Sequence, residues 1–202
     1  MLKFKVFLVS LILLFTTIIS FAQEAGTPPL LETDTAVWGK EDFKFPLGFA
    51  REIEYTGIEE AYFPRGWKIL DSDDFWSYAF VWKIDRDTLL TEKELERDIT
   101  MYFDGLMDMN RNGSKEAGIL NSTTLFIQKG RFSDISFYLG KIKTFDRFST
   151  QKPMILHVSV EQSHCEETGK MIIFFRFSPK EFEHRIWKKL NTLKLSADVC
   201  DG

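Results

Sequence analysis

The sequence is poor in the residues that most catalytic and metal sites require. It has three histidines and two cysteines in 202 residues. It contains no Gly-x-Ser-x-Gly nucleophile motif, no His-Glu-x-x-His zinc motif, no glycine-rich phosphate-binding loop and no Cys-x-x-Cys pair. The common motif-defined enzymes are therefore not indicated, and no cofactor is predicted. An enzyme without such motifs stays open, because catalytic partners need only be close in space.

The chain also lacks a strong excess of either charge. There are 26 Lys and Arg against 30 Asp and Glu, which gives a formal net charge of −4. A mildly acidic chain of mixed sign argues against a nucleic-acid-binding surface or a surface for anionic membranes. The expected partner is instead an unknown protein of the cell envelope or a small ligand.

A long apolar run stands at the N-terminus. Residues 1–22, MLKFKVFLVSLILLFTTIISFA, combine two early lysines, an apolar stretch and a small-x-small ending. The run is short for a transmembrane helix, although an uncleaved membrane anchor is the alternative. We expect a signal peptide over residues 1–22 and an exported protein, periplasmic or extracellular, with no stable membrane span after cleavage.

The two cysteines, Cys165 and Cys200, both follow the expected signal peptide. An even number of cysteines in an exported chain favours a disulfide bond. A metal site would need more ligands than these two cysteines and His164 provide. The sequence therefore predicts a Cys165–Cys200 disulfide and no metal site.

The pattern of apolar residues predicts an α+β fold. Residues 23–45 contain Pro28-Pro29 and no alternation, which indicates a linker. A capping box at Thr91 and Glu94 opens the first predicted helix, which ends near 110–113. Alternation predicts the strands Phe49–Tyr55, Trp76–Ile84, Thr123–Gln128, Ile135–Thr144, Met154–Glu161 and Lys170–Phe177.

A second helix is predicted from Ser178-Pro179 to about Leu193, with Phe182 in its apolar stripe. Short hairpin connections then give a mainly antiparallel sheet of about six strands, in the order ββαββββα, with two helices packed on it. Residues 46–202 form a single domain in this interpretation. Because the last helix would run back along the preceding strand, Cys200 should end beside Cys165.

The stretch DDFWSYAFVWKID, residues 73–85, places its rings on one face of the predicted strand. Such rings dominate core energetics, so the first interpretation is one wall of the core. The alternative is a platform for a hydrophobic or sugar ligand, because Tyr and Trp also suit half-wet sites. The candidate ligand-binding residues on this face are Trp76, Tyr78 and Trp82.

Two weaker patterns concern polar chemistry. His157 and Glu161 lie four residues apart on the polar side of their predicted strand, so both could reach one ligand, or they could simply face solvent. Asp108, Asn110 and Asn112 match the first positions of a calcium loop, but Ile119 stands where a bidentate Glu should be. A polar helix end explains these residues equally well.

Three stretches carry a resemblance: FPLGFAREIEYTGIEEAYFPRGW, FWSYAFVWKID and SPKEFEHRIWKKL. Together they resemble a group of uncharacterised exported bacterial proteins of unknown function, and the order of elements is distantly similar to PsbP/Mog1-like α/β/α sandwiches. The resemblance implies no activity and no site. We expect a non-catalytic module that binds a partner protein or ligand, and the alternative is a hydrolase-type enzyme that uses carboxylates with His157.

Overall fold

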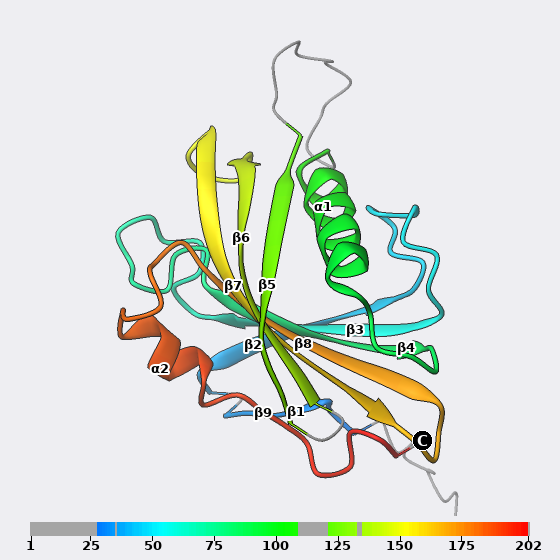
Figure 1. The fold of residues 1–202 in the computed structure, drawn as a ribbon. Coiled ribbons are helices and arrows are strands. Elements are labelled where there is room, and N and C mark those ends of the chain that lie inside the picture. The colour runs from blue at the N-terminus through cyan, green and yellow to red at the C-terminus, as the bar shows by residue number, and fades with distance from the viewer. Residues whose placement is uncertain (1–27, 35, 109–120, 133–134, 202) are drawn as a thin grey trace, which may run out of the picture.

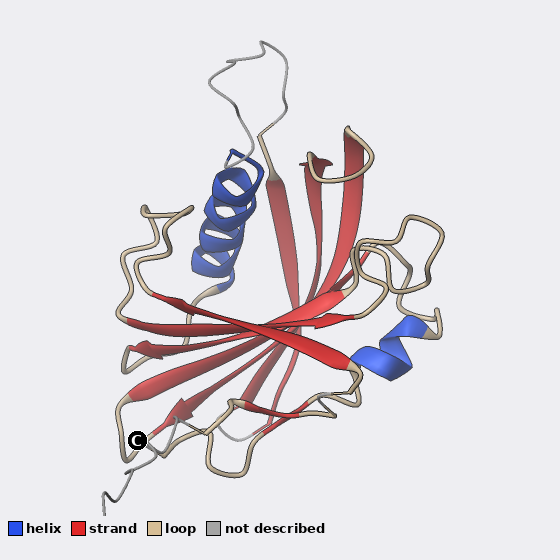
Figure 2. Cartoon of the chain, turned by 180° about the vertical axis from the view of Figure 1, so that it is seen from behind, coloured by secondary structure: helices blue, strands red, loops and turns tan. Residues whose placement is uncertain are grey.

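A computed structural model describes residues 28–34, 36–108, 121–132 and 135–201, so the expected signal peptide lies outside the described residues. The fold is a strongly twisted antiparallel sheet with one helix on each side (Figures 1 and 2). Its strands run in the order β2-β3-β4-β8-β7-β6-β5, and β1 and β9 form a separate pair. The elements are β1 (Leu31–Glu32), β2 (Trp38–Lys44), β3 (Gly57–Pro64), β4 (Tyr78–Asp85), α1 (Glu92–Asp108), β5 (Thr123–Phe132), β6 (Ile135–Asp146), β7 (Lys152–Cys165), β8 (Lys170–Ser178), α2 (Ile186–Leu190) and β9 (Lys194–Leu195).

The predicted α+β class and antiparallel sheet are confirmed, but the main sheet has seven strands rather than about six. The additional strand is β2, which lies within the expected linker and pairs with β3. The strand predicted at Phe49–Tyr55 is wrong, because these residues form turns whose Ala50 and Ile53 are buried in the core. Strand β3 was not predicted, because the adjacent Glu59 and Glu60 hide the alternation of apolar and polar residues along it.

One face of the sheet, here called the α1 face, carries the larger core. Helix α1 buries Leu95, Ile99 and Phe103 against the sheet. The capping box is confirmed, since the Thr91 backbone N–H donates to Glu94 at 2.8 Å. Gly105 lets α1 approach the preceding loop, because a Cβ there would lie 1.9 Å from the carbonyl oxygen of Phe49.

The opposite face, here called the α2 face, is covered over only part of its width. Helix α2 and the β1-β9 pair lie on this side (Figure 1), and their apolar residues join a second core with Val81 and Phe174. The predicted long second helix is wrong, since α2 has five residues. Residues 179–185 turn instead, which packs the Phe182 ring at a tilt against the Trp187 ring, with centroids 4.6 Å apart, and lets the Trp187 indole donate to the Lys180 carbonyl.

The predicted disulfide is confirmed. Cys165 ends β7 and bonds to Cys200, with their Cα atoms 5.4 Å apart. The covering segments are tied down further, because the Ser196 N–H donates to the Leu30 carbonyl at 2.9 Å. The Glu60 carboxylate accepts the Leu30 N–H at 2.8 Å and a Lys40 ammonium hydrogen at 2.7 Å. Together these contacts hold both ends of the described chain on the α2 face.

Candidate functional site

The aromatic stretch forms a wall of the core. Trp76 and Tyr78 are 2% exposed and Trp82 is fully buried, so none of these three candidates offers a ring to a ligand at the surface. Only Tyr78 and Trp82 lie in β4, because Trp76 precedes the strand in a turn with φ of 52°. Trp82 packs edge-on against Phe45, with ring centroids 5.4 Å apart. The burial supports the core interpretation over an open platform.

The core on the α1 face contains a carboxylate that the sequence analysis did not identify. Glu59 is fully buried, and it accepts hydrogen bonds from the Trp82 indole at 2.6 Å and the Tyr102 hydroxyl at 2.9 Å. Burial raises its pKa to about 7, although the two hydrogen bonds act in the opposite direction. The shared alternation of β3 and β4 could have revealed it, since Glu59 stands directly opposite Trp82.

His157 and Glu161 both lie on the α2 face, but they have different neighbours. His157 is 4% exposed beneath the Phe182 ring, and its Nε2 lies 3.0 Å from an Oε2 of exposed Glu181 without hydrogen-bond geometry. Glu161 is partly exposed and lies 4.0 Å from a guanidinium nitrogen of Arg176. No contact joins the two candidates within the described part of the chain.

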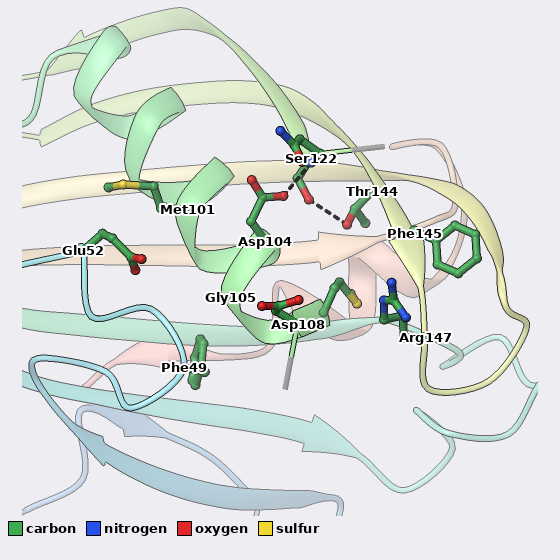
Figure 3. A pocket seen from close by; sticks show the side chains of 12 residues that line it. Phe49, Glu52, Met101, Asp104, Gly105, Asp108, Ser122, Thr144, Phe145 and Arg147 are labelled. Carbon is green, nitrogen blue, oxygen red and sulfur yellow. Dashed lines mark hydrogen bonds between the residues drawn. The ribbon is translucent and has the colours of Figure 1, made fainter. Parts of the chain in front are cut away.

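A polar cleft of about 330 Å³ lies beside the C-terminal end of α1. Figure 3 shows Asp104, Ser122 and Thr144 linked by hydrogen bonds at its wall, with distances of 2.6 Å and 2.9 Å. Arg147 also lines it, with an Nη2 that is shielded from water and has no hydrogen-bond partner among the described residues. Because the Asp104 carboxylate already accepts the Ser122 backbone N–H, this carboxylate is not a free ligand in the cleft.

The sequence does not predict a metal site. Within the described residues, no group of three or more His, Cys, Asp or Glu side chains could hold a metal ion. Most of the calcium-like pattern that begins at Asp108 lies outside the described residues.

No helix in the described ranges is both long and apolar enough to cross a membrane.

The most distinctive surface is on the α2 face, over strands β5, β6 and β7. Leu125 is 62% exposed, Ile127 54%, Ile155 50% and Phe137 39%, and partly exposed Leu139 lies directly opposite Ile127. The strand registers place all five side chains on this one face, and we call them the open surface. Monomeric proteins seldom gather exposed apolar groups in this way unless the patch has a function.

Two lysines interrupt the open surface. Lys141 is directly opposite Leu125, and Lys143 lies between Thr123 and Ile155 in the same register. Both lysines are exposed, and no carboxylate of the described residues forms an ion pair with either. The surface therefore combines apolar contact area with two exposed positive charges that form no ion pair within the described residues.

The edge of the sheet beside the open surface is protected by α1. The Glu96 carboxylate accepts the Phe126 N–H at 2.9 Å, and Asp104 accepts the Ser122 N–H at 2.6 Å. Between them, the Thr100 hydroxyl donates to the Thr124 hydroxyl at 2.9 Å. Successive contacts are four residues apart on the helix, about 6 Å, and two residues apart along the strand, about 6.6 Å. Side chains of α1 thus cover the first part of this edge, from Ser122 to Phe126.

Comparisons of the chain with protein-family models, curated proteins and solved structures give no match.

Proposed function

We propose that this protein is a non-catalytic exported module that binds a partner protein in the cell envelope through its open surface. One observation carries the proposal: four large apolar side chains, each 39–62% exposed, share one face of adjacent strands. Leaving such a patch in water has no structural benefit, whereas burying it against a partner removes apolar area from water. The disulfide is in keeping with an oxidising compartment.

The hydrolase alternative has less support. A general base must reach its substrate, and His157 lies 4% exposed beneath the Phe182 ring. Glu161, the other member of that hypothesis, pairs at 4.0 Å with Arg176 instead. The polar cleft lies on the α1 face, away from both residues. A binding surface therefore accounts for more of the molecule than a catalytic site does.

Site-specific photocrosslinking in cells that produce the protein tests this proposal. A photoreactive phenylalanine analogue at position 127 should give a discrete crosslinked protein species, and the same should hold at position 155. The matched control is position 93, where exposed Lys93 lies on α1 and is not part of the open surface. Crosslinks of equal yield from positions 93 and 127, or none from 127 and 155, would contradict the proposal.

A further inference from the structure

We infer that the open surface binds one amphipathic helix of a partner protein, with carboxylates beside its apolar stripe. The inference rests on the proposed function, and it specifies the chemical class of the partner. It follows from three properties of the surface: its dimensions, its unpaired lysines and the protected edge beside it.

The dimensions fit a single helix. Strands in a sheet are about 4.8 Å apart, so the three strands β5, β6 and β7 span about 10 Å, close to the diameter of one helix with side chains. Along β5, the surface extends from Thr123 to Gly130, which is roughly 23 Å of strand. A helix of about 15 residues has this length. The sheet's two own helices already cover apolar sheet surface in the same manner.

The positive charge of the open surface favours a helix with acidic residues beside its apolar stripe. Lys141 and Lys143 point from the same face as the apolar residues and have no carboxylate partner in the described part of the chain. A bound helix would pass between or beside them, so acidic residues next to its apolar stripe would meet both ammonium groups. Electrostatic complementarity of this kind mainly determines which partner is accepted.

The alternative of strand addition along the first part of β5 is disfavoured. A peptide that extends a sheet must pair with free backbone groups at the edge strand. The N–H groups of Phe126 and Ser122 are already taken by Glu96 and Asp104 of α1. A partner would have to displace the helix to reach them, whereas the face of the sheet is open without any rearrangement.

Two further occupants fit the charge less well. A second copy of this chain packed symmetrically on the open surface would bring Lys141 and Lys143 close to the same lysines of the other copy. An anionic membrane would attract these two lysines, but the whole chain carries a net charge of −4 and would be repelled. An acidic helix meets the local positive charge, and it is small enough to contact the open surface alone rather than the whole acidic chain.

Methyl NMR titration with two synthetic peptides tests the inference. The first peptide is a helix of about 15 residues with a leucine stripe flanked by glutamates, and the second has lysine in place of every glutamate. We expect the glutamate peptide to shift the methyl signals of Leu125, Ile127 and Ile155 and to bind roughly tenfold more tightly than the lysine peptide, because each exposed charge pair contributes modestly. The double variant Lys141→Glu/Lys143→Glu should reverse this preference, and vesicles that contain anionic lipid should leave the signals unchanged.

The outcomes separate the inference from the proposed function. Equal binding of both peptides at these methyl groups, or binding of the vesicles, overturns the acidic helix while leaving a binding surface in place. If neither peptide nor the vesicles shift these signals, the inference fails, and the crosslinking at positions 127 and 155 decides separately whether the open surface binds a protein. A preference for the glutamate peptide that persists in the double variant also overturns the role assigned to the lysines.

Discussion

The two halves of the α2 face differ although they belong to one continuous sheet. Phe174 on β8 and Phe137 on β6 stand in the same row of the register, separated only by Glu161 on β7. Phe174 is 1% exposed beneath the second core, and Phe137 is 39% exposed. The same type of side chain in the same row is therefore buried in one half and open to water in the other.

This difference shows which apolar residues the chain uses for its own stability. The covered half is closed by α2 and by the β1-β9 pair, and the Cys165–Cys200 disulfide fixes the end of the chain there. The open half has no such cover among the described residues. It nevertheless has Leu125 and Ile127 at exposed positions, where polar side chains would be better hydrated. Stability explains the first set of residues, and we propose binding as the role of the second.

The largest expected effect comes from truncating the two phenylalanines. Phe174→Ala should lower the free energy of unfolding by about 3–5 kcal/mol, because a large cavity replaces a buried ring. It also removes the ring on which the Arg176 guanidinium stacks at 3.7 Å. Phe137→Ala should change the same quantity by less than about 1 kcal/mol, since its ring is already partly in water. Urea denaturation of both variants measures the difference, and equal losses would show that the open half is covered in solution.

A smaller effect concerns pH and the fully covered α1 face. Because the pKa of Glu59 is raised from 4.5 to about 7, the folded protein binds a proton that the unfolded chain releases between these pH values. The contribution of Glu59 to the free energy of unfolding should therefore be largest below pH 4.5 and fall by about 3 kcal/mol as the pH rises to 7, at 1.36 kcal/mol per pKa unit.

Two glutamine variants isolate this contribution in urea denaturation at pH 5 and pH 8. Glu59→Gln should remove most of the fall, because a glutamine keeps an oxygen acceptor for Trp82 and Tyr102 but does not titrate. The control is Glu161→Gln, at a partly exposed residue of the α2 face, which should retain the wild-type pH dependence. Identical curves for the wild type and Glu59→Gln would show that this carboxyl group reaches water.

Some of the architecture could be predicted from sequence because its signals are local. The capping box at Thr91 and Glu94 identified the start of α1, and regular alternation identified β5 to β8. The disulfide was predicted from the cysteine count and from a long second helix, and the pairing is confirmed although that helix is not. The capping box and the alternation depend on neighbours in the chain, which the sequence displays directly.

The remaining features depend on contacts between distant segments. β2 shows no apolar alternation because it is an edge strand with mostly exposed side chains, so it resembled a linker. The second helix is shorter than expected because Phe182 packs against His157 and Trp187. These contacts override the helical spacing of the apolar residues. The open surface was missed for the same reason: Leu125 and Ile127 alternate like core residues, and only the lack of a covering element distinguishes them.

A smaller effect on stability than those of Phe174 and Glu59 concerns the edge of the sheet at β5. Glu96→Ala removes the acceptor of the Phe126 N–H, which should lower the free energy of unfolding by about 1 kcal/mol, because water replaces a partly buried hydrogen bond. Its effect on association should be larger, since an uncapped edge strand is a template for pairing with another chain. The control is Glu92→Ala, an exposed residue of the first turn of α1. Analytical ultracentrifugation over a range of concentrations should detect association of Glu96→Ala alone.

Partner binding by the same variants separates the roles of the edge and the open surface. If both variants stay as monodisperse as the wild type while Phe137→Ser reduces partner binding, the protein binds its partner through the open surface and not through the edge of β5. If Glu96→Ala instead gains affinity for the partner, the edge is the docking element and α1 is its inhibitor.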